Sequence, residues 1–426
     1  MIPLPCNASK PAGLAIDFDH SRKRWQGCAR RAAARPPTIT SIPLAAGSLL
    51  MQKVLVTGAA GFIGTHLVQE LLAQGLSVRA LDNLSPQIHG PEGSFPSWRD
   101  HPRVEVVQAS VTDPDVWEPA LADVDRVVHL AAETGTGQSM YQIAHYNAVN
   151  SQATAAMLEA IVNCGGIRRV VLSSSRSIYG EGAYSCGSCG LDPVYPPPRS
   201  AAALRRGEWD QPCPRCGAAL EARATTEDAP ARPSSVYAAT KLAQEDLVRI
   251  VAASNDIPTV ILRFQNVYGE GQSLNNPYTG ILSIFSTRIR RGLDLPIFED
   301  GTETRDFVHV SDVVAAISGG LAASPDVSGT INVGSGIATS ILTVATELNR
   351  AFGGTSETRV TGEYRLGDIR HNVADLTRLD AMLDVRPAVD LREGLGRFAR
   401  WVDAQPLPDD LLGRANDELR ARKLMG

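Results

Sequence analysis

The sequence predicts an α/β protein: a Rossmann-like, doubly wound parallel sheet with a smaller C-terminal substrate domain and a zinc-ribbon-like insert. Short runs that are continuously apolar, such as KVLVTG and RVVHLAA, alternate with amphipathic stretches from Lys53 onward. Strands of this kind, separated by helices, are typical of a parallel sheet covered on both faces. The alternation stops between Tyr179 and about Pro233, where Gly, Pro, Cys and Arg are frequent, and then resumes. That interruption indicates the insert.

The order of elements follows from the same patterns. After KVLVTG the expected strands are SVRALDN, VEVVQAS, RVVHLAA, RRVVLSSS and IPTVILRF, with long helices over 141–164 and over SSVYAATKLAQEDLVRIVAASND. Further helices are expected near 279–291 and 340–352 and from about 388. The first domain is therefore expected at 51–264, interrupted by the insert at 180–233, and the second at 265–426. The chain is expected to return to the first sheet near 305–335, at DFVHV and GTINVGSG.

Length and charge limit the classes of function. The 426 residues suit two or three domains, and the net charge is −5. Residues 1–50 carry seven Lys/Arg and two Asp, so the remainder is acidic, which argues against nucleic acid as a partner. No apolar run reaches the roughly 18 residues that a membrane span needs. We therefore expect a soluble, cytoplasmic protein with no membrane partner.

The first 50 residues lack apolar periodicity and are rich in Arg, Ala and Pro, which predicts a disordered extension. Three interpretations remain open: a non-native upstream start, a disordered tail and an organelle-targeting peptide. The first is favoured because Met51 lies just before a strand.

A glycine-rich turn, TGAAGFIG, joins the first strand to the first helix and contains Gly58, Gly61 and Gly64. Glycines at these places permit a tight turn, close approach of a pyrophosphate and close helix packing. Asp82 ends the next strand, where a carboxylate accepts hydrogen bonds from a ribose diol and repels a 2′-phosphate, so NAD is favoured over NADP. The alternative is a plain βα turn with a capping Asp. The residues expected to contact NAD are Gly58, Gly61, Phe62, Ile63, Gly64, Asp82, Asn83, Val111, Leu130, Ala131, Ala132, Tyr237 and Lys241.

Tyr237 and Lys241 stand one helical turn apart, so their side chains share a helix face. A phenol is a poor base at neutral pH, and a nearby ammonium stabilises its phenolate. Ser175 is expected at the carboxyl end of a parallel strand, where such sheets bind ligands. These three residues are the predicted catalytic group.

Together, TGAAGFIG, HLAA, LSSSRSIYG, YAATK, RFQNVYG and RDFVHVSDV resemble the extended short-chain dehydrogenase/reductases, specifically the NAD-dependent nucleotide-sugar epimerases and dehydratases. The resemblance implies that Tyr237 exchanges a proton with a sugar hydroxyl, that Lys241 lowers its pKa and holds the nicotinamide ribose, and that Ser175 binds the reacting oxygen. It also implies a homodimer, a structural role for Asn150, and a nucleotide-sugar site formed by Glu133, Thr134, Ser175, Asn266, Arg305 and Arg365.

The chain departs from the family pattern at several positions. Ser110 precedes Val111 where the family often has Asp, and Phe264 and Gln265 replace a common Tyr-Phe pair. The sugar dehydratases have an acidic pair after the catalytic Ser/Thr, whereas this chain has Arg176 and Ser177. Without an acid to protonate the leaving hydroxide, dehydration is disfavoured and epimerisation, at C4, is expected.

The stretch HLAAETGTGQSMYQ, the cysteine insert and NNPYTGILSIF resemble a subgroup that includes dTDP-L-rhamnose 4-epimerases. A UDP-hexose 4-epimerase, a keto-sugar reductase of the same fold and a scaffolding protein that uses a zinc module are the alternatives.

The insert contains two C-x-x-C pairs, Cys186 with Cys189 and Cys213 with Cys216, each followed by Gly. Four thiolates at this spacing suit a structural, tetrahedral zinc site, and a short segment without a core of its own gains stability from such a metal. A redox dithiol and cysteines that bind nothing are the alternatives. Because the insert lies between Ser175 and Tyr237 in sequence, we expect it to act as a rigid flap over the sugar pocket.

Overall fold

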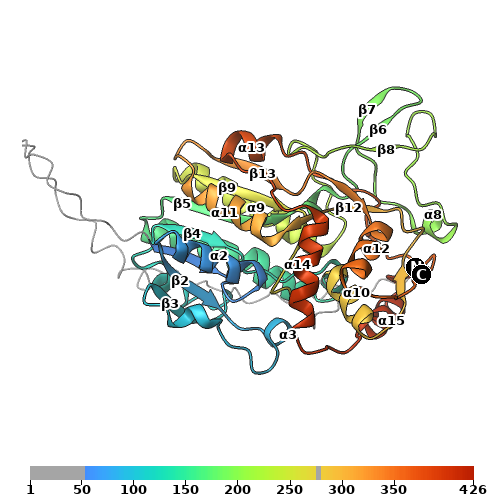
Figure 1. Cartoon of the computed structure of the whole chain (residues 1–426). Helices are drawn as coiled ribbons and strands as arrows, with labels where there is room; N and C mark the ends of the chain where they lie inside the picture. Colours follow the sequence, from blue (N-terminus) through green and yellow to red (C-terminus); the bar gives the residue numbers. More distant parts are fainter. Residues whose placement is uncertain (1–52, 275–279) are drawn as a thin grey trace, which may run out of the picture.

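The computed structural model describes residues 53–274 and 280–426 (Figure 1). The expectations for residues 1–50 lie outside the described residues.

The first domain is built around a seven-stranded sheet in the order β13-β9-β5-β4-β1-β2-β3. All of its neighbouring strands are parallel. Its strands are β1 (Lys53–Thr57), β2 (Ser77–Asp82), β3 (Val104–Gln108), β4 (Arg126–His129), β5 (Arg169–Ser175), β9 (Thr259–Phe264) and β13 (Gly329–Val333). The predicted α/β fold with a parallel sheet is confirmed.

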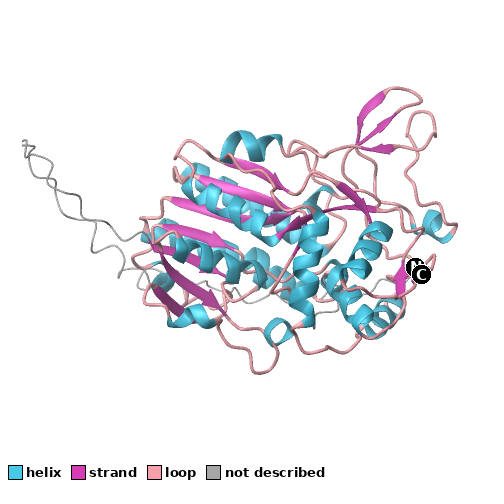
Figure 2. Ribbon diagram, viewed as in Figure 1, coloured by secondary structure: helices cyan, strands magenta, loops and turns pink. Residues whose placement is uncertain are grey.

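Helices cover both faces of this sheet (Figure 2). On one face Val54 and Val56 of β1 share a core with α2 (Phe62–Ala73), α11 (Val310–Ala322) and α13 (Thr377–Leu383). On the other face Leu55 packs in a second core with α4 (Trp117–Leu121), α7 (Ala153–Cys164) and α9 (Val236–Ser254). Alternate residues of one strand therefore enter opposite cores, which explains why the strands read as continuously apolar. Short elements α3 (Pro86–His89), η2 (Ser97–Asp100), α5 (Thr136–Ser139) and η4 (Arg176–Tyr179) lie in the connections.

The helix predicted over 141–164 is interrupted. It consists of α6 (Ile143–Tyr146), the π-helical turn η3 (Asn147–Gln152) and α7. Asn150 lies in this π turn, fully buried, and its side chain bonds the N–H and carbonyl of Glu133 and the hydroxyl of Thr240. The wider turn thus carries the amide that joins α9 to the loop after β4.

In the part of the chain expected to form the second domain, a separate hydrophobic core lies between α10 (Ile281–Arg290), α12 (Ile341–Ala351) and α14 (Leu391–Asp403). These helices agree with the predicted positions. Two small sheets accompany them: β11 (Leu295–Ile297) with β15 (Thr358–Val360), and β10 (Asn266–Tyr268), β12 (Thr304–His309) and β14 (Ala338–Ser340).

The strand DFVHV corrects one prediction. It lies in β12, which pairs with β10 and β14 and not with the main sheet. The Asp306 carboxylate accepts bonds from the backbone N–H groups of Ser335, Gly336 and Ala374, which fixes this strand to loops of the second domain. GTINV does join the main sheet, as β13.

The insert forms a separate small sheet of β6 (Tyr184–Cys186), β7 (Leu191–Val194) and β8 (Glu221–Ala222), with the short helix α8 (Ala201–Arg205). It stands at the outer side of the second domain, at the upper right of Figure 1. The last helix is α15 (Leu412–Ala421). Within 53–274 and 280–426, none of the helices combines the length and the apolar character that crossing a bilayer requires.

Candidate active site

A cavity of about 550 Å³ lies at the carboxyl ends of the strands of the main sheet. Seventeen of the predicted site residues line it, which are Gly58, Gly61, Phe62, Ile63, Gly64, Asp82, Asn83, Val111, Leu130, Ala131, Ala132, Glu133, Thr134, Ser175, Tyr237, Lys241 and Asn266. The carboxyl edge of a doubly wound sheet is where such folds bind ligands.

The geometry of the glycine-rich turn explains why glycine occurs at positions 58 and 64. Gly58 has φ +69°, and a Cβ there would lie 2.9 Å from the backbone nitrogen of Ala131. A Cβ on Gly64 would lie 2.1 Å from the carbonyl oxygen of Gly58. No side chain caps the N-terminus of α2 at Gly61, and Gly61, Phe62 and Ile63 line the cavity. This cradle fits a pyrophosphate.

Asp82 is fixed beside this turn. Its carboxylate accepts hydrogen bonds from the backbone N–H of Ala60 at 3.0 Å and of Leu84 at 2.8 Å. The side chain lines the cavity, so a carboxylate stands where an adenosine ribose would lie. The residues present therefore fit NAD.

The predicted catalytic group comes from two elements that face each other. Ser175 ends β5, and its hydroxyl accepts the N–H of Ser177 at 3.2 Å, which starts η4. Tyr237 and Lys241 lie in the first turns of α9, which Ser235 caps by accepting the N–H of Ala238. The amine of Lys241 donates to the carbonyl oxygen of Ser173 at 2.9 Å.

Electrostatics around the phenol differ from the expectation. Burial raises the pKa of Tyr237, while the hydrogen bond with Ser175 and the charge of Arg176 lower it. Lys241 was expected to supply the lowering effect. Burial, however, lowers the pKa of Lys241 itself to about 7, because nearby Glu245 only partly offsets the loss of solvation. Ser175 and Arg176 are therefore the groups that favour the phenolate.

Arg176 is the residue of this cavity whose importance the sequence analysis missed. Its Nε donates to the Oδ1 of Asn266 at 2.9 Å, and its side chain lines the cavity. Burial and the like charge of Arg305 lower its pKa to about 9, a value that keeps the guanidinium charged at neutral pH. Its place directly after Ser175 is a sequence signal for a side chain in this cavity.

Buried polar side chains support the carboxyl edge of β4 from behind. The His129 ring contacts the hydroxyls of Thr57 at 2.8 Å and Thr154 at 3.0 Å. Burial lowers the pKa of His129 to about 3, so this ring stays neutral. Gln244 donates to the same Thr154 hydroxyl, which ties α9 to α7.

The two predicted arginines lie apart from the others. Arg305 lines neither cavity; its guanidinium donates to the backbone carbonyls of Thr304 and Arg370, and the residue is buried. Arg365 lines a smaller adjoining cavity of about 130 Å³, which shares Thr136 with the larger one. Of this pair, Arg365 lines a described cavity and Arg305 does not.

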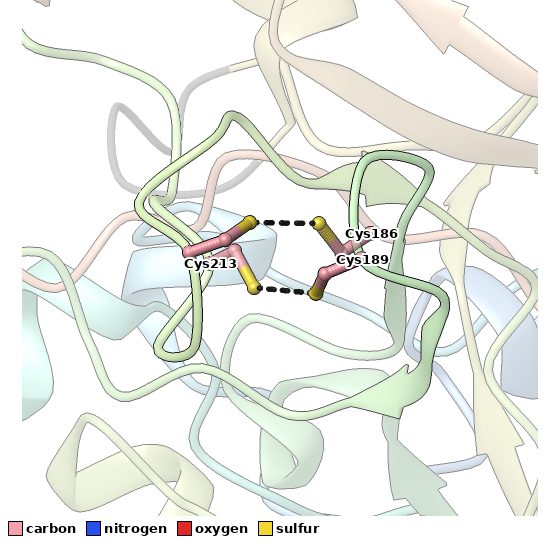
Figure 3. A group of neighbouring side chains, drawn as sticks. Cys186, Cys189 and Cys213 are labelled. Atoms are coloured by element: carbon pink, nitrogen blue, oxygen red, sulfur yellow. Dashed lines mark hydrogen bonds between the residues drawn. The ribbon is translucent and has the colours of Figure 1, made fainter.

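The four insert cysteines converge (Figure 3). Their sulfurs all lie within 4.8 Å of one another, with 3.5 Å between Cys186 and Cys216 and 3.6 Å between Cys189 and Cys213. Four sulfurs at about 2.3 Å from one zinc ion would be about 3.8 Å apart in a tetrahedron. The geometry of these donors therefore fits zinc.

The insert does not cover the sugar pocket. No residue of 180–233 lines either described cavity, which argues against the expected flap. Instead the insert is joined to the second domain by buried charges: Glu181 accepts from the N–H of Arg370 at 2.7 Å, and Arg199 donates to Glu299 at 2.7 Å and to the carbonyl of Asp368 at 3.0 Å. Proximity in sequence to Ser175 and Tyr237 did not predict this docking.

Comparison with known proteins agrees with the geometry. The model of the "NAD dependent epimerase/dehydratase family" matches residues 54–203 and 215–334. A dTDP-L-rhamnose 4-epimerase of Burkholderia thailandensis is 41% identical over 354 residues, 82% of this chain and 95% of that protein. A UDP-glucose 4-epimerase of Mycolicibacterium smegmatis is 33% identical over 82% of this chain and 98% of its own length.

Solved structures share the fold. The UDP-glucuronic acid 4-epimerase of Bacillus cereus, in complex with UDP-glucuronic acid and NAD, superposes with a TM-score of 0.68 at 26% identity and covers 83% of this chain and 99% of that one. MoeE5 in complex with UDP-glucuronic acid and NAD gives 0.66 at 31% identity, over 82% and 99%. The chain belongs to the NAD-dependent epimerase/dehydratase family.

Proposed function

We propose that this chain is an NAD-dependent nucleotide-sugar 4-epimerase that interconverts dTDP-L-rhamnose and dTDP-6-deoxy-L-talose through a transient 4-keto sugar. The observation that carries the proposal is that Ser175, Tyr237 and Lys241 line the same cavity as the glycine-rich turn and Asp82. The 41% identity to a dTDP-L-rhamnose 4-epimerase supports the choice of sugar. As an epimerase the chain is an isomerase: substrate and product have the same composition.

When bound, NAD supplies reversible hydride transfer at its nicotinamide ring. Tyr237 removes the proton from the C4 hydroxyl and returns it at the end of the reaction. Ser175 hydrogen-bonds the reacting oxygen, and Arg176 stabilises the negative charge of the phenolate. Where the dehydratases have an acid, this chain has Arg176, which cannot protonate a leaving hydroxide, and the proposed 6-deoxy sugar has no C6 hydroxyl to lose. Reduction of the keto sugar is therefore the open route.

The first domain holds NAD on Gly58, Gly61, Gly64 and Asp82. The second domain and the loop after β4 hold the nucleotide sugar, with Glu133, Thr134, Asn266 and Arg365 as the proposed contacts. Arg305 is not among them, because it lines neither described cavity and its Nη1 donates to two backbone carbonyls.

The test is to incubate purified protein with dTDP-L-rhamnose, UDP-glucose and UDP-glucuronic acid, without added NADH, and to follow epimers by NMR. A 4-epimer of the dTDP sugar alone supports the proposal. Turnover of UDP-glucose alone would instead favour a UDP-hexose 4-epimerase, as in the Mycolicibacterium relative. Oxidation of these sugars that consumes added NAD stoichiometrically and releases NADH would identify a redox enzyme of the same fold. Absence of any turnover by the wild-type protein, equal to that of Y237F, would leave a non-enzymatic role.

Structural zinc in the insert is part of the proposal. Two knuckles supply four thiolates, and Gly190 and Gly217 after each second cysteine have φ +68° and +75°, as tight turns require. One zinc per chain by elemental analysis is expected, and the double variant C213S/C216S should lose it and melt at a lower temperature. A zinc-free wild-type protein with the same melting temperature would contradict a structural role.

A cytoplasmic homodimer is the proposed form. The adjacent helices α7 and α9 expose Val162 (43%) and Ile250 (56%), apolar side chains that a second copy would cover. Light scattering is expected to give twice the chain mass, and I250E should shift it toward the monomer.

A further inference from the structure

The C-terminal segment 412–426, formed by α15 and a short extended end, lies beyond the residues that match the family model. Its apolar side chains are buried: Leu412 is 7% exposed, Leu419 4% and Met425 7%. The segment is therefore a packed part of the fold, not a loose tail.

On one side the backbone of the segment pairs with the stretch of chain that carries Arg365. Tyr364 N–H donates to the carbonyl of Gly426 at 2.8 Å, and the N–H of Gly426 donates back to Tyr364 at 3.1 Å. Leu366 N–H donates to the carbonyl of Leu424 at 2.9 Å, so the two backbones pair as an antiparallel bridge.

The same segment orients the guanidinium of Arg365. Its Nη2 donates to the Oδ1 of Asn416 at 3.0 Å, and Asn416 is only 6% exposed. The guanidinium lies 4.9 Å from the ring centre of Phe298. The Nε of Arg365 is buried and has no partner among the described residues, and the residue as a whole lines the smaller cavity.

On its other side the segment touches the loop after β4. A Cβ built on Gly137 would lie 3.4 Å from Leu419, and Arg422 stacks 4.0 Å from the ring centre of Tyr141. Leu419 and Leu424 line the smaller cavity opposite Thr136, which also borders the larger one. The segment thus bridges both domains at the mouth of the substrate cavity.

We propose that the C-terminal segment is a fixed wall of the nucleotide-sugar site, and that Asn416 is a positioning residue that holds Arg365 toward the diphosphate of the substrate. The inference rests on the proposed function. A guanidinium whose direction is fixed loses less conformational entropy when it binds a diphosphate, so the segment lowers KM.

The experiment compares N416A with R414A, an exposed position of the same helix, in the full-length holoenzyme. Binding of dTDP alone is measured by calorimetry, and KM and kcat are measured with dTDP-L-rhamnose. Loss of a hydrogen bond to a charged group predicts about a 10-fold rise in the dTDP Kd and in KM, with kcat nearly unchanged. R414A should match wild type. Equal Kd values for N416A and wild type would overturn the inference.

A double variant separates positioning from general damage. If Asn416 acts through Arg365, N416A should add nothing to the Kd already raised by R365A. An additive loss would overturn the inference, whereas a wild-type protein that does not bind dTDP at all would overturn the proposed substrate instead. Deletion of residues 412–426 should raise KM further, while the protein retains bound NAD. A truncated protein with the wild-type KM would contradict the proposal that this segment is a wall of the site.

Discussion

Replacing Lys241 by Met is expected to stabilise the fold at neutral pH and to abolish turnover. Lys241 is 3% exposed, and burial lowers its pKa from 10.5 to about 7. Because the native state binds fewer protons than the unfolded state between these two values, the penalty grows as the pH falls from 10.5 to 7 and is constant below about 7. At about 1.4 kcal/mol per unit the penalty is about 4 kcal/mol at pH 7 and about 2 kcal/mol at pH 9.

The variant also loses a contact, because the carbonyl of Ser173 no longer receives the amine at 2.9 Å. An unsatisfied buried acceptor costs about 1–3 kcal/mol at any pH. K241M should therefore be about 1–3 kcal/mol more stable than wild type at pH 7, and this advantage should shrink by about 2 kcal/mol at pH 9.

Urea unfolding of NAD-free protein, followed by tryptophan fluorescence, measures the stability difference between K241M and wild type at pH 7 and at pH 9. Trp117 is 1% exposed in the core of the first domain and reports on its unfolding. K53M is the matched control, because Lys53 pairs with Glu105 at the surface. A stability difference between K241M and wild type that does not change from pH 7 to pH 9 would refute the account of Lys241 as a lysine kept partly neutral by burial.

Three further changes test other parts of the structure. G58A places a Cβ 2.9 Å from the nitrogen of Ala131 at φ +69°. The amount of co-purified NAD should therefore fall to a small fraction of the wild-type content, as measured by the absorbance of the supernatant after denaturation. R176A should lower kcat by about 10-fold or more, because a charge-assisted contact is worth about 1.5–3 kcal/mol. It should also move the acidic limb of kcat against pH, which reports deprotonation of Tyr237, to higher pH, because the cation that lowers the pKa of Tyr237 is lost. R176K restoring only part of kcat would agree with this role, and wild-type kinetics for R176A would contradict it. R370A removes a guanidinium that is 2% exposed and leaves the carboxylate of Glu299 with one fewer partner. The free energy of unfolding in urea should therefore fall by about 3–5 kcal/mol. A change below about 1 kcal/mol would mean that these charges are solvated.

Local sequence was sufficient for features that depend on neighbouring residues. The glycines of the TGAAGFIG turn, the strand-end positions of Asp82 and Ser175, and the helical spacing of Tyr237 and Lys241 all follow from short-range geometry. Each of these residues lines the large cavity. The C-x-x-C pairs likewise predicted that their sulfurs would meet.

Contacts between distant residues could not be read in this way. Arg305 looks like a ligand-binding arginine, yet its direction is set by the carbonyl of Arg370, 65 positions later. DFVHV is as apolar as a strand of the main sheet, and only the pairing with β10 and β14 shows where it belongs. The docking of the insert depends on Glu181 and Arg370, which are 189 positions apart.

The insert and the C-terminal segment act on the same stretch of chain, 364–371. The C-terminal segment pairs with Tyr364 to Leu366, whereas Arg199 of the insert holds the carbonyl of Asp368 and Glu181 holds the N–H of Arg370. Arg365, in the first of these anchored parts, and Asp368, in the second, both line the smaller cavity. If the insert binds zinc as proposed, the metal would influence substrate binding without lining the pocket: its loss would loosen one anchor of this stretch, and loss of 412–426 would remove the other. Zinc removal should accordingly raise KM less than deletion of the C-terminal segment, since only the latter orients the guanidinium itself.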